Sequence, residues 1–288
     1  MKKSETQWLT IIGVILQFLL GSSFALGQTK VVEITVDDPR PMAAASGKLQ
    51  ELSGIPINYE DMPVYYSGDI KVADFAAQSP VPPGGERTLV ARGGQLSVAI
   101  LVDATTGRLK DIQAVSTALA ALVSAYNSSN LPGDFEVEQL NGVFFVRPVR
   151  YRDASGGTQP MTPVLSTLIT FPEEKRTREQ MMRLILRQVS AAAGLEIGLN
   201  MGGFTEVTMD AQNEPAYHAI ARLLATGNSP AAAPANASWD ANLSYRFLCQ
   251  PHYGCALNVW GTRPSDLCRG SGCEPYSPPP RESGFKAP

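Results

Sequence analysis

The chain has few of the residues and motifs that most enzymes use for catalysis. It has two histidines among its 288 residues and no serine-hydrolase, phosphate-loop, zinc-peptidase or dinucleotide motif. Two pairs of adjacent acids, Asp37-Asp38 and Glu173-Glu174, precede predicted helices, where the helix dipole favours a carboxylate. His218 lies off the apolar stripe of its predicted helix and is expected at an exposed or edge position. We therefore predict a protein that is not an enzyme and that uses no cofactor.

Basic charge is also scarce. The chain has 24 lysines and arginines against 27 acidic residues, and they form no basic block. Proteins that bind nucleic acid cluster lysine and arginine to neutralise phosphates. Nucleic acid is therefore not an expected partner.

An apolar stretch near the N-terminus has the features of an export signal. It runs from Trp8 to Leu20, follows Lys2 and Lys3, and is followed by small residues suited to a cleavage site in Ser23-Phe24-Ala25. Residues 1–25 are thus predicted to be a signal peptide. The alternative is a retained membrane anchor, for which about 20 apolar residues are usual. Both alternatives place the rest of the chain outside the cytoplasm, and the chain contacts the membrane only through this N-terminal segment, if the segment is not cleaved.

Cysteine is absent until close to the C-terminus, where four cysteines are clustered. In an oxidising compartment such a set predicts disulfides. We expect Cys249–Cys255 across a hairpin and Cys268–Cys273 around a glycine-containing loop, although sequence alone leaves three pairings open. The alternative is a secreted metal-binding or redox protein in which His252 joins these four cysteines, at spacings less regular than those of most zinc sites.

The rest of the sequence shows one order of elements twice: strand, helix, two strands, helix and hairpin. In the first repeat, residues 30–150, period-two alternation predicts the opening strand and spacings of three and four predict the helices. Asn141-Gly142 predicts the turn of the closing hairpin. The residues behind the first two predictions are Val32, Ile34 and Val36, then Met42, Ala45, Leu49 and Leu52.

The second repeat, residues 165–262, has the same order. Thr177 and Gln180 have the spacing of a capping box, which predicts the start of a helix that ends at Gly194. Asn213 is expected to cap the next helix. The closing hairpin pairs residues 243–247 with residues 256–260.

Three segments lie outside this pattern. Residues 60–93 are predicted to be a long irregular insert, because Pro and Gly at 80–85 sustain neither helix nor ladder. Residues 151–164 are predicted to be a linker that permits motion, and residues 263–288 a proline-rich tail. The sequence therefore predicts an α+β fold of two tandem small domains of β-α-β-β-α-β-β order behind an export signal.

Parts of both repeats resemble a known family. Residues 34–37 and 49–59 (ITVD and LQELSGIPINY) are similar to the opening half of the short N-terminal domain of secretins and TonB-dependent receptors. Residues 207–210, 219–224 and 243–245 (VTMD, AIARLL and LSY) resemble the closing half of that domain. No later segment resembles a secretin pore or a receptor barrel.

The resemblance implies a compact fold with two helices held between small sheets. It also implies a periplasmic location, a docking role toward another envelope protein, and a possible link to secretion or outer-membrane receptor systems. The family contributes no catalytic residues. The hypothesis that follows is a non-enzymatic docking module of the cell envelope, periplasmic or secreted.

Overall fold

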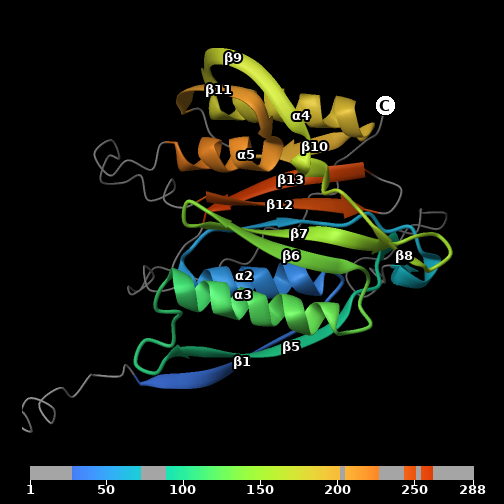
Figure 1. Cartoon of the computed structure of the whole chain (residues 1–288), viewed down its shortest axis with the longest axis vertical. Helices are drawn as coiled ribbons and strands as arrows, with labels where there is room; N and C mark the ends of the chain where they lie inside the picture. The colour runs from blue at the N-terminus through green and yellow to red at the C-terminus, as the bar shows by residue number, and fades with distance from the viewer. Residues whose placement is uncertain (1–27, 73–88, 202–204, 227–242, 251–253, 262–288) are drawn as a thin grey trace, which may run out of the picture.

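The computed structural model describes residues 28–72, 89–201, 205–226, 243–250 and 254–261 (Figure 1). It shows a mixed α/β fold with four α-helices and several sheets within these residues. No helix in this part of the chain is long and apolar enough to cross a membrane. The predicted signal peptide, His252, Cys268, Cys273 and the tail lie outside the described residues.

The N-terminal half places two helices between two sheets (Figure 1). The outer layer is an antiparallel pair of β1 and β5, and the inner layer contains β2, β7 and β6. The elements are β1 (Thr29–Asp38), α2 (Pro41–Ser53), β2 (Ile57–Glu60), β5 (Gly94–Asp103), α3 (Ile112–Asn127), β6 (Asp134–Leu140) and β7 (Val143–Arg152).

The C-terminal half has the same order of elements. Its helices lie between an outer pair, β9 and β11, and an inner set of β10, β13 and β12. The elements are β9 (Leu168–Thr177), α4 (Arg178–Ala193), β10 (Ile197–Asn200), β11 (Glu206–Pro215), α5 (Ala216–Ala225), β12 (Leu243–Gln250) and β13 (Gly254–Gly261).

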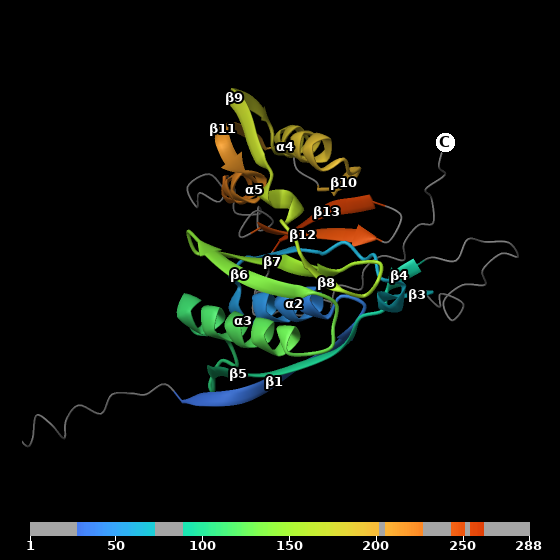
Figure 2. The same ribbon diagram turned by 45° about the vertical axis from the view of Figure 1, so that its right-hand side comes forward.

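The inner layers of the two halves form one sheet. Its order is β10-β13-β12-β2-β7-β6, with β8 (Thr158–Pro160) attached to β7. The halves meet where β12 runs parallel to β2, with Arg246 opposite Tyr59. Figures 1 and 2 show α4 and α5 on one face of this sheet and α2 and α3 on the other.

Strand β7 separates the two hydrophobic cores. Because successive side chains of a strand point to opposite faces, Phe144 and Val146 are buried with α2 and α3, whereas Phe145 is buried with α4 and α5. Phe145 makes an edge-to-face contact with Tyr217 of α5, with the ring centroids 5.1 Å apart. Each half therefore needs the other half to bury both faces of the shared sheet.

Several predicted local signals are present in the structure. The hydroxyl of Thr177 accepts from the N–H of Gln180 and the Gln180 side chain accepts from the N–H of Thr177, which completes the capping box of α4. Gly194 ends that helix with φ of 64°. Asn141 and Gly142 both have positive φ in the turn between β6 and β7.

Other boundaries differ from the predictions. Strand β9 extends through Glu173 and Glu174, so these acids lie within a strand, not directly before a helix. Strand β11 continues to Pro215, which is also the residue before α5, so Asn213 is not its cap. Pairing with the neighbouring strand extends both elements beyond their apolar alternation.

The predicted insert and linker contain regular structure. The described parts of the predicted insert include η1 (Ser67–Asp69) and an antiparallel pair of β3 (Ile70–Val72) and β4 (Leu89–Ala91), and Asp61 and Met62 are buried. The run of Pro and Gly at 80–85 lies outside the described residues. Residues 151–164 include the end of β7 and strand β8, and they lead into η2 (Val164–Ser166), where Leu165 is buried. Hydrogen bonding with β7 orders a segment whose composition suggested a loop.

Candidate docking site

The central sheet has two open edges, β10 at one end and β6 at the other. Within the described residues, each of these strands pairs with a single neighbour: β10 with β13, and β6 with β7. An open edge presents unpaired N–H and C=O groups that can receive another strand. The two edges are the first candidates for contact with a partner.

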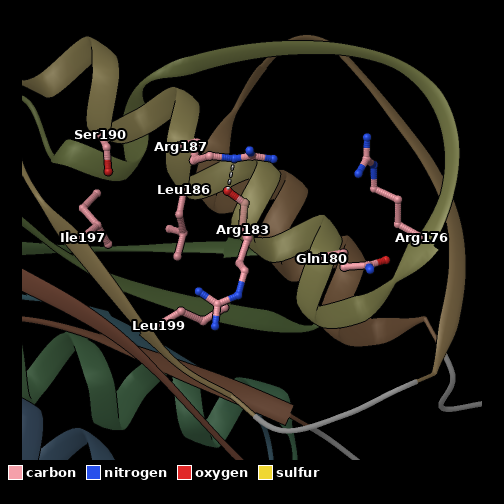
Figure 3. Close-up of a pocket in the computed structure, with 8 residues that line it drawn as sticks. All are labelled: Arg176, Gln180, Arg183, Leu186, Arg187, Ser190, Ile197 and Leu199. Atoms are coloured by element: carbon pink, nitrogen blue, oxygen red, sulfur yellow. Dashed lines mark hydrogen bonds between the residues drawn. The ribbon is translucent and has the colours of Figure 1, made fainter.

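A groove lies beside β10, under α4. It has a volume of about 300 Å³. Figure 3 shows Arg183 and Leu186 directed from α4 toward Leu199 of β10. The remaining lining residues are Arg176, Gln180, Arg187, Ser190 and Ile197. The groove therefore has an apolar floor and a wall that carries three arginines.

Two of these arginines are arranged along the helix itself. Arg183 Nη2 lies 2.8 Å from Glu179 Oε1, one turn earlier in α4. Arg187 Nε donates to the Arg183 carbonyl oxygen at 3.3 Å, and Arg187 forms no ion pair with a carboxylate among the described residues. Arg176 also pairs with Glu174, so Arg187 supplies the positive charge that an acidic side chain of a partner can neutralise.

The corresponding space in the N-terminal half is filled. There the helix is α2, the edge strand is β2, and β12 of the other half lies along that edge. Leu248 of β12 packs on the N-terminal core, and Arg246 lies against Gly47 of α2, where a Cβ would overlap its guanidinium. The N–H of Asp61 donates to the Phe247 carbonyl at 2.8 Å. A parallel strand thus completes the α2 groove, whereas no strand of the described residues pairs with the β10 edge of the α4 groove.

The end of this internal join is fixed by a buried polar cluster. Asp61 accepts hydrogen bonds from Arg40 Nε at 2.6 Å, from the Tyr59 hydroxyl at 2.9 Å and from the Cys249 N–H at 3.3 Å. Arg40 also donates to the Cys249 carbonyl at 2.6 Å. Burial, aided by the charge of Asp61, raises the pKa of the Tyr59 hydroxyl. These bonds connect the start of α2 with β12.

Glu60 is a second buried acid at the join. It is fully buried, and Oε1 accepts from the N–H of Leu165 at 3.1 Å. Burial raises the pKa of Glu60 to about 7, because hydrogen bonds from the backbone offset only part of the lost hydration. The protonation state of Glu60 therefore changes near neutral pH.

A third cluster joins β6 and β7 with α5. Glu138 accepts from the Tyr217 hydroxyl at 2.9 Å and lies 3.2 Å from His218 Nε2, and Arg147 stacks over the Tyr217 ring. Burial acts to raise the pKa of Glu138, but these hydrogen bonds and the charge of Arg147 outweigh it, so that its pKa is lowered. His218 thus belongs to a polar cluster between the halves, which its helical position did not indicate.

The structure contains the predicted Cys249–Cys255 disulfide, which joins opposite residues of β12 and β13. Two of the five residues in the alternative metal site are therefore unavailable as thiolates while the bond is intact. Within the described ranges, no group of three or more histidine, cysteine, aspartate or glutamate side chains is placed to hold a metal ion.

The most informative site residues were not identified from sequence. Arg183 and Arg187 lie on the polar side of an amphipathic helix, and Arg246 and Gly47 are far apart in the chain. The signal that could have found the groove is the mismatch between the two helices, since α2 carries small residues where α4 carries arginines.

Comparison of the chain with protein-family models, with curated proteins and with solved structures gave no significant match.

Proposed function

We propose that this chain is an exported, non-enzymatic envelope protein that docks a partner protein in the periplasm, and that the groove between α4 and β10 is its docking site. One observation carries the proposal. The equivalent space beside α2 and β2 is filled by strand β12, whereas within the described part of the chain no strand lies along β10 beside α4. The pairing of β12 with β2 therefore shows how a strand can fill a space of this kind.

The arrangement of the helices also supports this role. In each half, two helices lie between a two-stranded layer and a three-stranded layer, which is the compact fold implied by the resemblance to the secretin and TonB-receptor domain. We infer that the halves are duplicated domains of that kind, and that their role is the docking role such domains have in secretion and outer-membrane receptor systems.

The chemistry of the groove indicates what kind of segment it receives. A strand parallel to β10 would gain backbone hydrogen bonds along the open edge. Its side chains on the α4 side would meet Leu186, Ile197 and Leu199 at the floor and Arg183 and Arg187 at the wall. We therefore expect an extended segment that carries acidic side chains on the face toward α4.

Site-specific crosslinking in the native envelope tests this function. A photo-reactive amino acid at Ser190, inside the groove, is expected to capture a protein, whereas the same group at Lys175, on the outer strand β9, is expected not to capture that protein. Charge reversal of Arg183 and Arg187 should reduce the capture. Equal capture at both positions, or none at Ser190, would contradict the proposed site.

The alternative of a metal or redox centre at the cysteine cluster gains no support from the contacts, because Cys249 and Cys255 are joined to each other. Peptide mapping under non-reducing conditions, together with metal analysis of the exported protein, distinguishes the two functions. Bound zinc with free thiols would favour the alternative.

A further inference from the structure

We propose that the strand received at β10 is β6 of a second molecule of this chain, so that molecules join head to tail. This inference rests on the proposed docking function of the α4–β10 groove and names its partner. It uses both open edges of the central sheet.

The two open edges, β10 and β6, are equivalent in the two halves to β2 and β12, the strands that pair inside the molecule. Strands β2 and β10 each run parallel to the last strand of their half. Phe144 N–H donates to the Pro56 carbonyl at 3.1 Å, and Cys255 N–H donates to the Glu196 carbonyl at the same distance. Strands β6 and β12 each form the antiparallel hairpin with that last strand. The internal join of β12 to β2 therefore predicts a join of β6 to β10.

These shared hydrogen bonds fix the register of the new join. When the two halves are aligned on these hydrogen bonds, the strand pairings make Val137 of β6 equivalent to Phe247 of β12. The same alignment makes Met201, just after β10, equivalent to Asp61, just after β2. Inside the molecule, the N–H of Asp61 donates to the carbonyl of Phe247. Between molecules, the N–H of Met201 would donate to the carbonyl of Val137.

The same correspondence brings opposite charges together. Gly47 of α2 and Arg187 of α4 lie at the same distance before the glycine that ends each helix. Arg246 lies against Gly47 in the internal join, and Glu136 is the β6 residue that corresponds to Arg246. Glu136 of one molecule would therefore face Arg187 of the next.

A second pair of opposite charges, Glu138 and Arg183, is expected next to the first. Glu138 is the next residue on that face of β6, and Arg183 lies one turn before Arg187 in α4. Within one molecule, Arg147 Nη2 is 2.9 Å from Glu136 and 2.7 Å from Glu138, which holds both carboxylates on this face. Glu138 also contacts Tyr217 and His218, so the half-exposed Glu136 is the carboxylate that best complements the arginines of the groove.

The number of β6 residues with free backbone groups limits the affinity of the contact between molecules. Asn127 of α3 already satisfies both backbone groups of Phe135, at 2.9 Å each, so the part of β6 after Phe135 is open. The internal join is short, with two residue pairs in register. We therefore expect a weak contact that depends on protein concentration.

Because β6 and β10 are different surfaces, the contact is heterologous. Such contacts give open chains of molecules or, if the rotation closes, rings. A twofold dimer would instead require one edge to pair with itself. The expected assembly is thus a series of oligomers.

Sedimentation of the exported, processed chain over a range of concentrations tests the proposal. The wild-type chain should form oligomers, and Arg187→Glu should weaken association by about tenfold or more, since it places two acids opposite each other. Glu136→Arg should do the same, and the two variants mixed, or both changes in one chain, should restore assembly. Lys175→Glu, on the outer sheet, is the matched control. Thermal unfolding verifies that each variant is folded.

A wild-type chain that stays monomeric up to its solubility limit would overturn the proposal, as would oligomers that neither single reversal weakens. These results leave the docking function intact if crosslinking at Ser190 captures a different envelope protein. Capture of this same chain at Ser190, lost in Glu136→Arg cells, supports both proposals.

Discussion

At the scale of single residues, the most consequential positions are buried acids at the join of the two halves. Glu60 has no exposure to solvent and accepts a hydrogen bond from the backbone N–H of Leu165, and it forms no ion pair with a cation within the described residues. A carboxylate in such a place is costly unless it is fully paired, so the proton is retained to a higher pH than in the unfolded chain.

Glu60 should make stability depend on pH. Its pKa is about 7 in the folded chain against an ordinary value of 4.5. Because the folded state binds the proton more tightly, the stabilisation is present below pH 4.5 and is lost as pH rises through about 7. Glu60→Gln should remove this loss, so its unfolding free energy relative to wild type should rise by roughly 3 kcal/mol from about pH 4 to about pH 8.

Urea denaturation at a series of pH values measures this difference. Glu51→Gln, at an exposed position of α2, is the matched control for the loss of a carboxylate. A difference between wild type and Glu60→Gln that is constant with pH would show that Glu60 does not titrate in this range.

At the scale of elements, local signals were the reliable part of the sequence. The turn at Asn141-Gly142 and the capping box at Thr177 each depend on residues a few positions apart, and both are present. The period-two and helical patterns likewise fall on strands and helices of the structure, but they did not indicate β3, β4 and β8. Boundaries failed where pairing with a distant strand extended an element, as in β9.

Local sequence signals could not predict the candidate site, because the site depends on which strands are neighbours in the sheet. Nothing near Tyr59 or Arg246 in the sequence indicates that β2 and β12 are neighbours. These two residues are paired in the sheet, yet 186 residues lie between them in the chain. The groove beside α4 is recognised as open only by comparison with the filled groove beside α2. That comparison requires the topology of the sheet.

The packing of α2 against β12 gives a prediction at this scale. Gly47 lies within the helix, where alanine is normally more stable by about 1 kcal/mol. In the wild-type background Gly47→Ala should lose most of this gain, because the new Cβ has to displace the Arg246 guanidinium, which is the end of a flexible side chain. In an Arg246→Ala background the same change should stabilise it.

A double-mutant cycle by denaturant unfolding provides the test, with Arg246→Ala alone as the reference. The coupling between the two positions should be about 0.5–1 kcal/mol. Equal effects of Gly47→Ala in both backgrounds would mean that Arg246 does not lie against α2.

At the scale of the whole molecule, the shared sheet makes the halves one structural unit. Phe144 and Phe145 are neighbours on β7, yet they are buried in different cores. The ion pair of Arg40 with Asp61 and its bonds to Cys249 span the same join. Residues 151–164, predicted to be a linker, add strand β8 to the sheet.

We therefore expect the described part of the chain to unfold in one cooperative transition. Phe145→Ala should cost about 3–5 kcal/mol, and because both cores share β7, it should lower hydrogen-exchange protection in α2 and α3 as much as in α4 and α5. Val31→Ala, at an exposed position of β1, is the control and should change neither. Two separate transitions, or lost protection confined to α4 and α5, would show that the halves are independent domains and that β12 is a detachable strand. In that case the β2 edge could open to a partner in the same way as the β10 edge.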